Sequence, residues 1–390
     1  MSSSLRPFRW LNACSHHCRP LHLSALKTSR TVKVQGTPLT YDDLRPYEPI
    51  EQIQVYRDQT AYISFLDHRV ALQFALAHGQ HTQSSDDVSR LNPSTLARLW
   101  KGQSRTFVWR PRGEQDLALD IDGVIKQFRT FGMVLDVKEV EHISRKKAYS
   151  ITFARLEDAV EAAESYPPKD IEHVPFEIGP IQQAVRTFPA FQVWDKYNMA
   201  YNVVHIRDFV PTEENWSRLY TALWDINIDN CMRLDNNTLA LKFTEPACLN
   251  TFLRRAPKGK GNLWPWLRSV CSRPVQSTFY QHRWLAAQLG IARRIKLRIP
   301  VNLLLKSASL VGKRLKLEPG AVEAKLKESF SALGLVGCVN THAGAGFVDF
   351  MDIEGAVEAM LQAPESIPGL EDEQMIFFPR IGNDSGHSYG

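Results

Sequence analysis

Four segments of the chain share one pattern of hydrophobic and polar positions. In each, a β-like run ends in a phenylalanine, and small or apolar residues follow six, nine and ten positions later. Positions with that spacing lie on one face of an α-helix, so each segment predicts a strand and a helix that packs back onto it. The phenylalanines are 88, 90 and 107 residues apart, at Phe65, Phe153, Phe243 and Phe350. The chain is therefore predicted to contain four copies of one structural unit.

The residues upstream of each phenylalanine extend the pattern. They predict one further helix per copy, at 41–47, 120–132, 212–224 and 320–334. The first of these helices is short, because Pro46 interrupts it. We expect a closing strand at 176–179 in the second copy and at 375–378 in the fourth. Each unit thus predicts the order strand, helix, strand, strand, helix, strand.

This order resembles the RNA recognition motif family, whose third strand carries the signature [RK]-G-[FY]-[GA]-[FY]-[VI]-x-[FY]. Residues 343–350 (Ala-Gly-Ala-Gly-Phe-Val-Asp-Phe) match this signature at five of eight positions, and residues 58–65 match it at four. The resemblance implies an α+β protein of tandem βαββαβ modules, each ferredoxin-like with a four-stranded antiparallel sheet.

Alternation along the signature strand identifies the side chains that would meet a ligand. Its even positions face the helices, whereas its odd positions project onto the open face of the sheet. The fifth position is Tyr62 in the first copy and Phe347 in the fourth. We expect both rings to stack on RNA bases.

The other two copies depart further from the signature. Lys146 stands at the first position of the second copy, but its fifth position is a serine, so we expect Phe107 and Trp109 of the preceding strand to supply the platform. The third copy has only Thr238 and Ala240 at the exposed positions. We therefore predict that the third copy is a structural or protein-contact module.

The repeat also predicts the segment boundaries. These are a leader at 1–30, modules at 31–80 (or 31–110), 105–180, 200–257 and 313–380, and a basic insert at 258–312. Residues 80–104 have the composition of a linker. The β-like run at 106–110 could close the first module or open the second.

Charge is distributed unevenly along the chain, whose formal net charge is +5. Residues 1–41 carry six basic and no acidic residues, and residues 246–317 carry fifteen basic and no acidic residues. The remainder has 26 basic against 42 acidic residues. Uncompensated basic residues neutralise phosphates and release counterions, so the second zone predicts sequence-independent binding of nucleic acid. An anionic membrane surface is the other partner that this zone would fit.

Three clusters of cations in and around the insert are the expected phosphate contacts. Their members are Arg254, Arg255, Lys258, Lys260, Arg293, Arg294, Lys296, Arg298, Lys313, Arg314 and Lys316. Aromatic residues are interleaved with them and could add stacking or cation–π contacts. The tryptophans of this segment, such as Trp284, are expected to be core or loop anchors.

The first 30 residues are rich in serine, contain arginine and lysine, and lack both acidic residues and a long apolar run. This composition is typical of a mitochondrial transit peptide, which predicts localisation in the matrix. A basic tail that contacts RNA directly is the alternative.

No catalytic motif stands out in the sequence. It holds no Walker loop, no dinucleotide-binding glycine pattern after a strand, no GxSxG and no HExxH. Its six cysteines form no paired CxxC spacing, and no apolar run approaches the ~18 residues of a membrane span. We therefore expect no enzyme activity, no cofactor and no metal.

The sequence predicts a non-catalytic mitochondrial RNA-binding protein that acts on transcripts or ribosomal RNA, in RNA metabolism or translation. The alternative is a structural or assembly protein of the mitochondrial ribosome or of an expression complex, with modules that contact proteins. Exposure of Tyr62 and Phe347 separates the two hypotheses, because buried rings cannot stack on bases.

Overall fold

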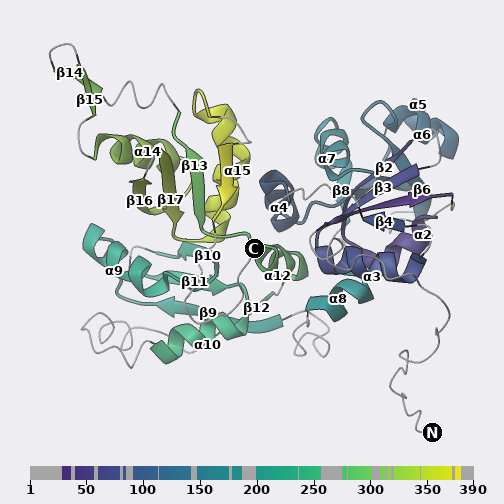
Figure 1. Cartoon of the computed structure of the whole chain (residues 1–390). Helices are drawn as coiled ribbons and strands as arrows, with labels where there is room; N and C mark the ends of the chain where they lie inside the picture. Colours follow the sequence, from purple (N-terminus) through teal and green to yellow (C-terminus); the bar gives the residue numbers. More distant parts are fainter. Residues whose placement is uncertain are drawn as a thin grey trace, which may run out of the picture.

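The computed structural model describes most of the chain between residues 29 and 378 (Figure 1). The described residues are 29–36, 40–56, 60–79, 82–84, 91–112, 114–141, 147–174, 178–186, 199–235, 237–255, 275–278, 280–300, 308–311, 314–317, 320–342, 344–370 and 374–378. They form four four-stranded antiparallel sheets and one two-stranded hairpin. Among the described helices, none is long and apolar enough to cross a membrane.

The first two modules follow one order of elements. The first contains β1 (Thr31–Gln35), α2 (Tyr41–Leu44), the 3₁₀ helix η1 (Arg45–Tyr47), β2 (Ile50–Val55), β3 (Thr60–Phe65), α3 (His68–His78) and β4 (Thr82–Ser84). The second contains β5 (Thr106–Trp109), α5 (Glu114–Leu117), α6 (Ile121–Phe128), β6 (Val134–Glu141), β7 (Lys147–Phe153), α7 (Leu156–Glu164) and β8 (Ile171–His173).

The last two modules repeat that order. The third contains β9 (Met199–Ile206), α9 (Glu213–Leu223), β10 (Ile228–Arg233), β11 (Leu239–Phe243), α10 (Pro246–Arg255) and β12 (Val275–Thr278). The fourth contains β13 (Arg294–Arg298), the hairpin β14 (Ala308–Val311) and β15 (Arg314–Leu317), α14 (Ala321–Ser331), β16 (Val336–His342), β17 (Ala345–Phe350), α15 (Ile353–Ser366) and β18 (Met375–Phe377). Connecting helices are α4 (Pro93–Trp100), α8 (Pro180–Arg186) and α12 (Gln281–Gln288).

All four sheets have the same strand order. Within each module the second strand pairs with the third, the third with the first, and the first with the fourth, always antiparallel. This is the βαββαβ arrangement of the RNA recognition motif, so the predicted fold class is confirmed.

The repeated phenylalanines lie at the centres of the module cores. All four are 0% exposed. The residues six and nine positions later, such as Ala71 and Phe74 on α3, are also almost fully buried. Packing against a helix also explains the signature glycine at position 346. A Cβ at Gly346 would lie 3.0 Å from the Leu326 side chain of α14. The sequence repeat therefore reports the packing of one helix face against each sheet.

Several predicted boundaries are wrong. The predicted insert at 258–312 contains β12, which closes the third sheet, and β13, which is a central strand of the fourth sheet. The second module closes with β8 and not at 176–179. The strand at 106–109 opens the second module, since β4 already closes the first. These boundaries were not predictable, because the sequence of a single strand such as β13 does not indicate which of two neighbouring sheets it joins.

The connecting helices α4 and α12 join the modules through a shared apolar core. Leu99 of α4 and Trp284 of α12 pack with Leu66 from the first module and Leu156 from the second. The opposite side of α4 joins the fourth module's core, where Trp100 is fully buried. Figure 1 shows α4 between the two halves of the molecule, beside α15 and α12. Residues 80–104 therefore include a structural element that packs against three modules.

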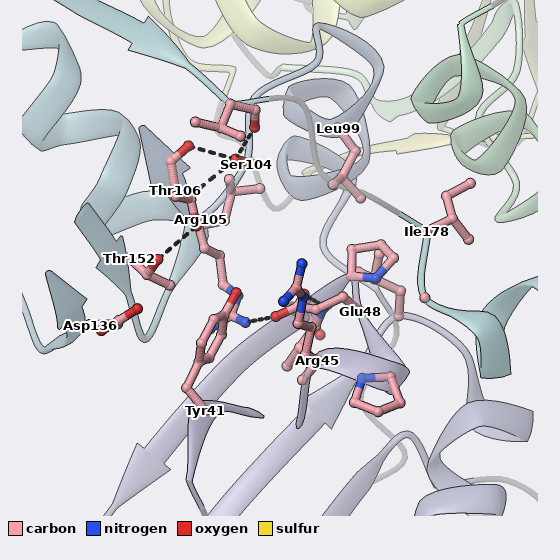
Figure 2. A pocket seen from close by; sticks show the side chains of 18 of the residues that line it. Tyr41, Arg45, Glu48, Leu99, Ser104, Arg105, Thr106, Asp136, Thr152 and Ile178 are labelled. Carbon is pink, nitrogen blue, oxygen red and sulfur yellow. Dashed lines mark hydrogen bonds and ion pairs between the residues drawn. The ribbon is translucent and has the colours of Figure 1, made fainter. Parts of the chain in front are cut away.

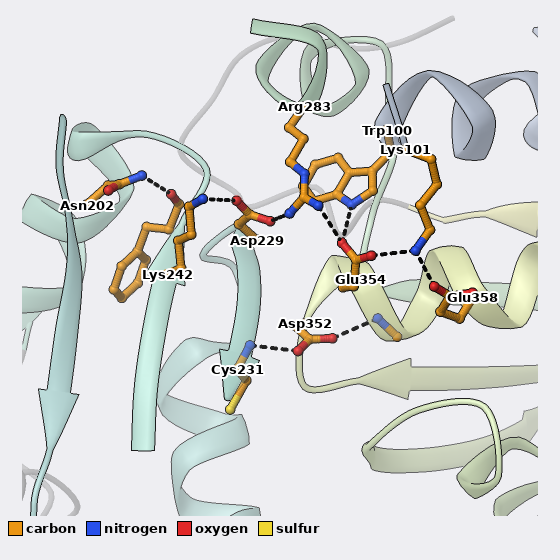
Figure 3. Close-up of polar contacts among 12 residues, drawn as sticks. Trp100, Lys101, Asn202, Asp229, Cys231, Lys242, Arg283, Asp352, Glu354 and Glu358 are labelled. Atoms are coloured by element: carbon orange, nitrogen blue, oxygen red, sulfur yellow. Dashed lines mark hydrogen bonds and ion pairs between the residues drawn. The ribbon is translucent and has the colours of Figure 1, made fainter. Parts of the chain in front are cut away.

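A carboxylate on α15 gathers polar side chains at this junction (Figure 3). Glu354 accepts a hydrogen bond from Trp100 Nε1 at 2.9 Å and ion-pairs with Lys101 and with Arg283 of α12. Arg283 also pairs with Asp229 of the third module. Burial opposes ionisation of Glu354, but the Lys101 hydrogen bond and the Arg283 charge hold the pKa of its carboxyl below the usual value.

The third and fourth modules meet along a second buried interface. Asp352 caps α15 by accepting from Gly355 N–H, and its other oxygen accepts from Cys231 N–H of β10 at 2.7 Å. Arg293 donates to the carbonyls of Met351 and Leu223. Burial raises the pKa of Asp352 to about 6. Buried polar atoms of each module thus find their hydrogen-bond partners in the other module.

The shared core predicts a strong effect of Trp284→Ala on stability. Trp284 is 2% exposed, and emptying such a site costs about 3–5 kcal/mol of unfolding free energy. The control Trp224→Ala removes a side chain that is 52% exposed and should cost less than about 1 kcal/mol. Urea unfolding followed by circular dichroism measures both values. Equal, small losses would contradict a stabilising junction.

Candidate nucleic-acid interface

The open face of the first sheet carries a row of three side chains on three adjacent strands. Strand register places Tyr62 of β3 between Lys33 of β1 and Gln54 of β2. These residues alternate with the core residue Ile63 and its neighbours, so they lie on the face away from the helices. Tyr62 is half-buried. We call this row, together with Tyr56, the first-module platform.

A second ring and a chain of hydrogen bonds order the first-module platform. The Tyr56 ring is 54% exposed and meets Tyr62 edge to face, with centroids 5.5 Å apart. The Tyr56 hydroxyl donates to Gln54, the Gln54 amide donates to Gln52, and the Gln52 amide donates to Ser64. The polar side chains around the rings are therefore held in defined positions.

The fourth sheet carries a matching row. Phe347 of β17 lies between Lys296 of β13 and Asn340 of β16. Phe347 is half-buried, and Phe378, which follows β18 and is 38% exposed, meets it edge to face at 5.6 Å. We call these four residues the fourth-module platform. Tyr62 and Phe347 thus both lie half-buried on the sheet face away from the helices, and their contact with RNA stays a prediction.

Cations border the fourth-module platform. The Arg294 guanidinium lies 5.5 Å from the Phe347 ring centroid, and Lys296 Nζ lies 5.7 Å from that of Phe378. Arg294 forms a two-pronged pair with Asp349 at 2.7 and 2.9 Å, so its charge is compensated within the sheet. Arg298, two residues beyond Lys296 on the same strand face, is exposed. Lys296 and Arg298 are thus the cations of β13 that are placed to meet a phosphate.

Both platforms repeat one arrangement of cation, ring and amide on the first, third and second strands of the module. A ring face stacks on any base, whatever its identity. An ammonium neutralises a phosphate, and a carboxamide offers one acceptor and two donors to the edge of a base. Each platform therefore combines the chemistry needed to hold a single nucleotide of an unpaired strand.

Among its described residues, the second sheet carries no such platform. Phe107 and Trp109 are 0% and 1% exposed, and they pack against Phe128 of α6 on the helix side of the sheet. Their prediction as an RNA platform is wrong, because β5 places them on the core face and Thr106 and Val108 on the open face. Lys146 lies outside the described residues.

The open side of the third sheet is partly occupied by residues at the start of α12. Lys242 Nζ lies 4.4 Å from the ring centroid of Tyr280, and Lys242 also pairs with Asp229 at 3.4 Å. Arg283 pairs with the same carboxylate. Ala240, expected at an exposed position, is 2% exposed. These contacts within the chain use positions that would otherwise meet a ligand.

The predicted phosphate contacts have different environments. Arg293 is 7% exposed and bonded to two carbonyls, so its prediction as a phosphate contact is wrong. Arg254 is exposed near the end of α10. Arg255 belongs to α10, and Arg314 and Lys316 belong to β15, within the hairpin inserted between β13 and α14. Lys258, Lys260 and Lys313 lie outside the described residues.

Five platform residues were missed from the sequence, namely Lys33, Gln54, Tyr56, Asn340 and Phe378. Alternation along the first and second strands could have identified three of them, since each stands opposite the signature ring in the register. Tyr56 and Phe378 have no such signal, because both follow the last residue of a strand.

No family model matches the chain, and no curated protein matches it in sequence. Among solved structures, the three N-terminal RNA binding domains of the yeast splicing factor Prp24 are 18% identical, with 69% of this chain and 95% of that chain covered and a TM-score of 0.16.

Two further solved structures cover parts of the chain. RNA recognition domains 1 and 2 of Sex-lethal from Drosophila melanogaster are 12% identical, with 37% of this chain and 99% of that chain covered and a TM-score of 0.16. The first two RRM domains of the yeast poly(U) binding protein Pub1 are 14% identical, covering 44% and 96%, again with a TM-score of 0.16. Likenesses this weak say nothing about which ligand this chain binds.

Replacement by alanine should affect stability differently at Arg293, which directly precedes β13, and at Arg298, which ends it. Arg293→Ala leaves the Met351 and Leu223 carbonyls without this donor and should cost about 2–4 kcal/mol of unfolding free energy. Arg298→Ala removes an exposed side chain and should cost less than about 0.5 kcal/mol. Thermal or urea unfolding of both variants checks this. A stable Arg293→Ala protein would contradict the structural role given to Arg293.

Proposed function

We propose that this protein is a non-catalytic binder of single-stranded RNA that uses the open sheet faces of its first and fourth modules. The observation that carries the proposal is the repeated row of cation, ring and amide, Lys33–Tyr62–Gln54 and Lys296–Phe347–Asn340. A buried core ring needs no such polar neighbours. An open ring flanked by a cation and an amide matches the stacking, phosphate and edge contacts of an unpaired nucleotide.

The acid-free zone at 246–317 supplies the electrostatic part of the proposal. It carries fifteen basic residues, among them Lys296 and Arg298 on the fourth-module platform face and Arg254 on α10. Such a zone gives salt-sensitive affinity without sequence preference. The weak affinities of two platforms on one chain would then multiply through effective concentration, provided one strand reaches both.

We place this function in the mitochondrial matrix, where the RNA would be a transcript or ribosomal RNA and the role would lie in RNA metabolism or translation. The support is the composition of residues 1–30, which is basic, rich in serine and free of acidic residues. The end of the predicted leader is wrong by two residues, because Ser29 and Arg30 are buried in the first module, where Arg30 pairs with Glu51 at 2.8 Å.

A second candidate function has one observation in its favour. The contacts of Tyr280 and Arg283 with Lys242 and Asp229 occupy part of the third sheet's open side. A module with that side occupied fits a structural or assembly component of the mitochondrial ribosome or an expression complex. The platforms favour RNA binding as the main activity, with the third module as scaffold.

The RNA proposal predicts the effect of a double variant, Tyr62→Ala with Phe347→Ala. Each lost stack is worth about 1–3 kcal/mol, so affinity for an unstructured RNA should fall about tenfold or more. Fluorescence anisotropy at several salt concentrations measures it, and affinity should also fall steeply with salt.

The matched control replaces two exposed apolar residues of helices α3 and α9, Leu76→Ala with the α9 C-cap variant Trp224→Ala, and should leave the affinity unchanged. Salt-steep binding that the ring variant leaves intact would mean that the cations alone hold RNA. Absence of any RNA binding would refute the proposal and favour the scaffold function.

The matrix proposal predicts that residues 1–30 direct a fluorescent protein to mitochondria. Replacing Arg6, Arg9 and Arg19 with glutamine should abolish this, because import requires a positively charged amphipathic segment. Microscopy with a mitochondrial dye reads out the result. A diffuse signal from the unaltered leader would show that it is not a transit peptide.

A further inference from the structure

A cavity of about 1010 Å³ lies between the first and second modules (Figure 2). One side is built by the first module's segment from Tyr41 to Glu51, and the other by the open face of the second sheet. The two modules are held together here by direct contacts. Ile53 N–H donates to the Ala154 carbonyl at 2.9 Å, and Glu48 pairs with Arg105. The cavity is therefore bounded by two fixed walls.

The floor of the cavity is the face on which the second sheet lacks an aromatic residue. Among the described residues of that sheet, the open face carries Ser150, Thr152 and Thr106 at its centre, with Thr106 and Thr152 hydroxyls 2.9 Å apart. An aromatic ring is nevertheless present, because Tyr41 of α2 lines the same cavity as Thr106 (Figure 2). Lys138 on β6 lies near the same ring.

The charges around the cavity nearly cancel. Its lining contains three cationic and four acidic side chains, namely Arg45, Arg105, Lys138, Asp42, Glu48, Glu51 and Asp136. Lys138 pairs with Asp136 at 2.8 Å, and Arg105 pairs with Glu48. The more exposed cations are Lys138 and Arg45. An interior of paired charges and hydroxyls suits a neutral group with hydrogen-bonding edges better than a phosphate.

Arg105 is a structural part of the cavity wall. Its side chain is 5% exposed, donates a hydrogen bond to the Phe153 carbonyl at 3.0 Å and pairs with Glu48. Arg105 therefore fixes the wall and does not serve as a contact for a ligand.

We propose that this cavity is a third RNA site, which takes a single nucleobase of the bound strand and packs it against Tyr41. The site rests on the proposed RNA-binding function and deepens it. Tyr41 supplies to the second sheet the ring that its own strands place in the core. The hydroxyl of Ser150 faces the edge of the base, and Arg45, which is exposed at the rim, meets a flanking phosphate. The volume is at the upper end of the ~300–1,000 Å³ of small-molecule sites and has room for a nucleotide.

The test uses the full-length chain and the four ribonucleoside monophosphates as separate probes, followed by saturation-transfer NMR at millimolar concentration. At least one probe should bind the unaltered protein. Binding to the cavity should be lost in Tyr41→Ala and in Ser150→Trp, which fills the floor. It should persist in Tyr41→Phe, which keeps the ring, and in the Tyr62→Ala, Phe347→Ala double variant.

The matched control is Glu172→Trp, which introduces the same side chain on β8 of the same sheet outside the cavity lining. It should leave mononucleotide binding unchanged. Circular dichroism shows whether each variant is folded. If Tyr41→Ala does not fold, the comparison of Ser150→Trp with Glu172→Trp still tests the site.

Three outcomes separate this site from the proposed function. Mononucleotide binding that is lost only in the Tyr62→Ala, Phe347→Ala variant would overturn the cavity site and leave the platforms as the RNA-binding surface. No mononucleotide binding, with longer RNA still bound, would also overturn the cavity site alone. Loss of all RNA binding in the unaltered protein would overturn both.

Discussion

The buried junction around α4 and α12 is the interaction on which the arrangement of the whole molecule depends. Leu99 and Trp284 close an apolar core to which the first and second modules both contribute, and Trp100 continues from it into the core of the fourth. Glu354 then neutralises Lys101 and Arg283 at the edge of that core. Burying these charges is tolerable only because each is paired, so the same contacts that bring the modules together also fix how they meet.

This arrangement divides the four sheets into two kinds. The first and fourth sheets keep a half-exposed ring with a cation and an amide on either side, which is the chemistry of single-strand recognition. The open sides of the second and third sheets instead face other parts of the chain, Tyr41 in one case and Tyr280 in the other. A common fold thus presents different surfaces, because each sheet meets different neighbours.

The fold and the two strongest site residues could be predicted because their signals are local. A strand alternates with period two and a helix with period 3.6, so Phe65 and Ala71, or Phe350 and Ala356, reveal their faces within one segment. Phe107 and Trp109 were misplaced although they obey the same alternation. Alternation says that the two rings share a face, but only the helix that covers the sheet, with Phe128, decides which face that is.

Sequence by itself determined the four-fold repeat, the βαββαβ order and the rings Tyr62 and Phe347 on open faces. Tertiary structure alone decided that Arg293 is buried in an interface between modules and that Tyr41 lies beside the open face of a neighbouring sheet. The physical reason is sequence separation. Whether a cation meets solvent, a carboxylate or a carbonyl depends on segments tens to hundreds of residues away, whose approach leaves no periodic mark on the local sequence.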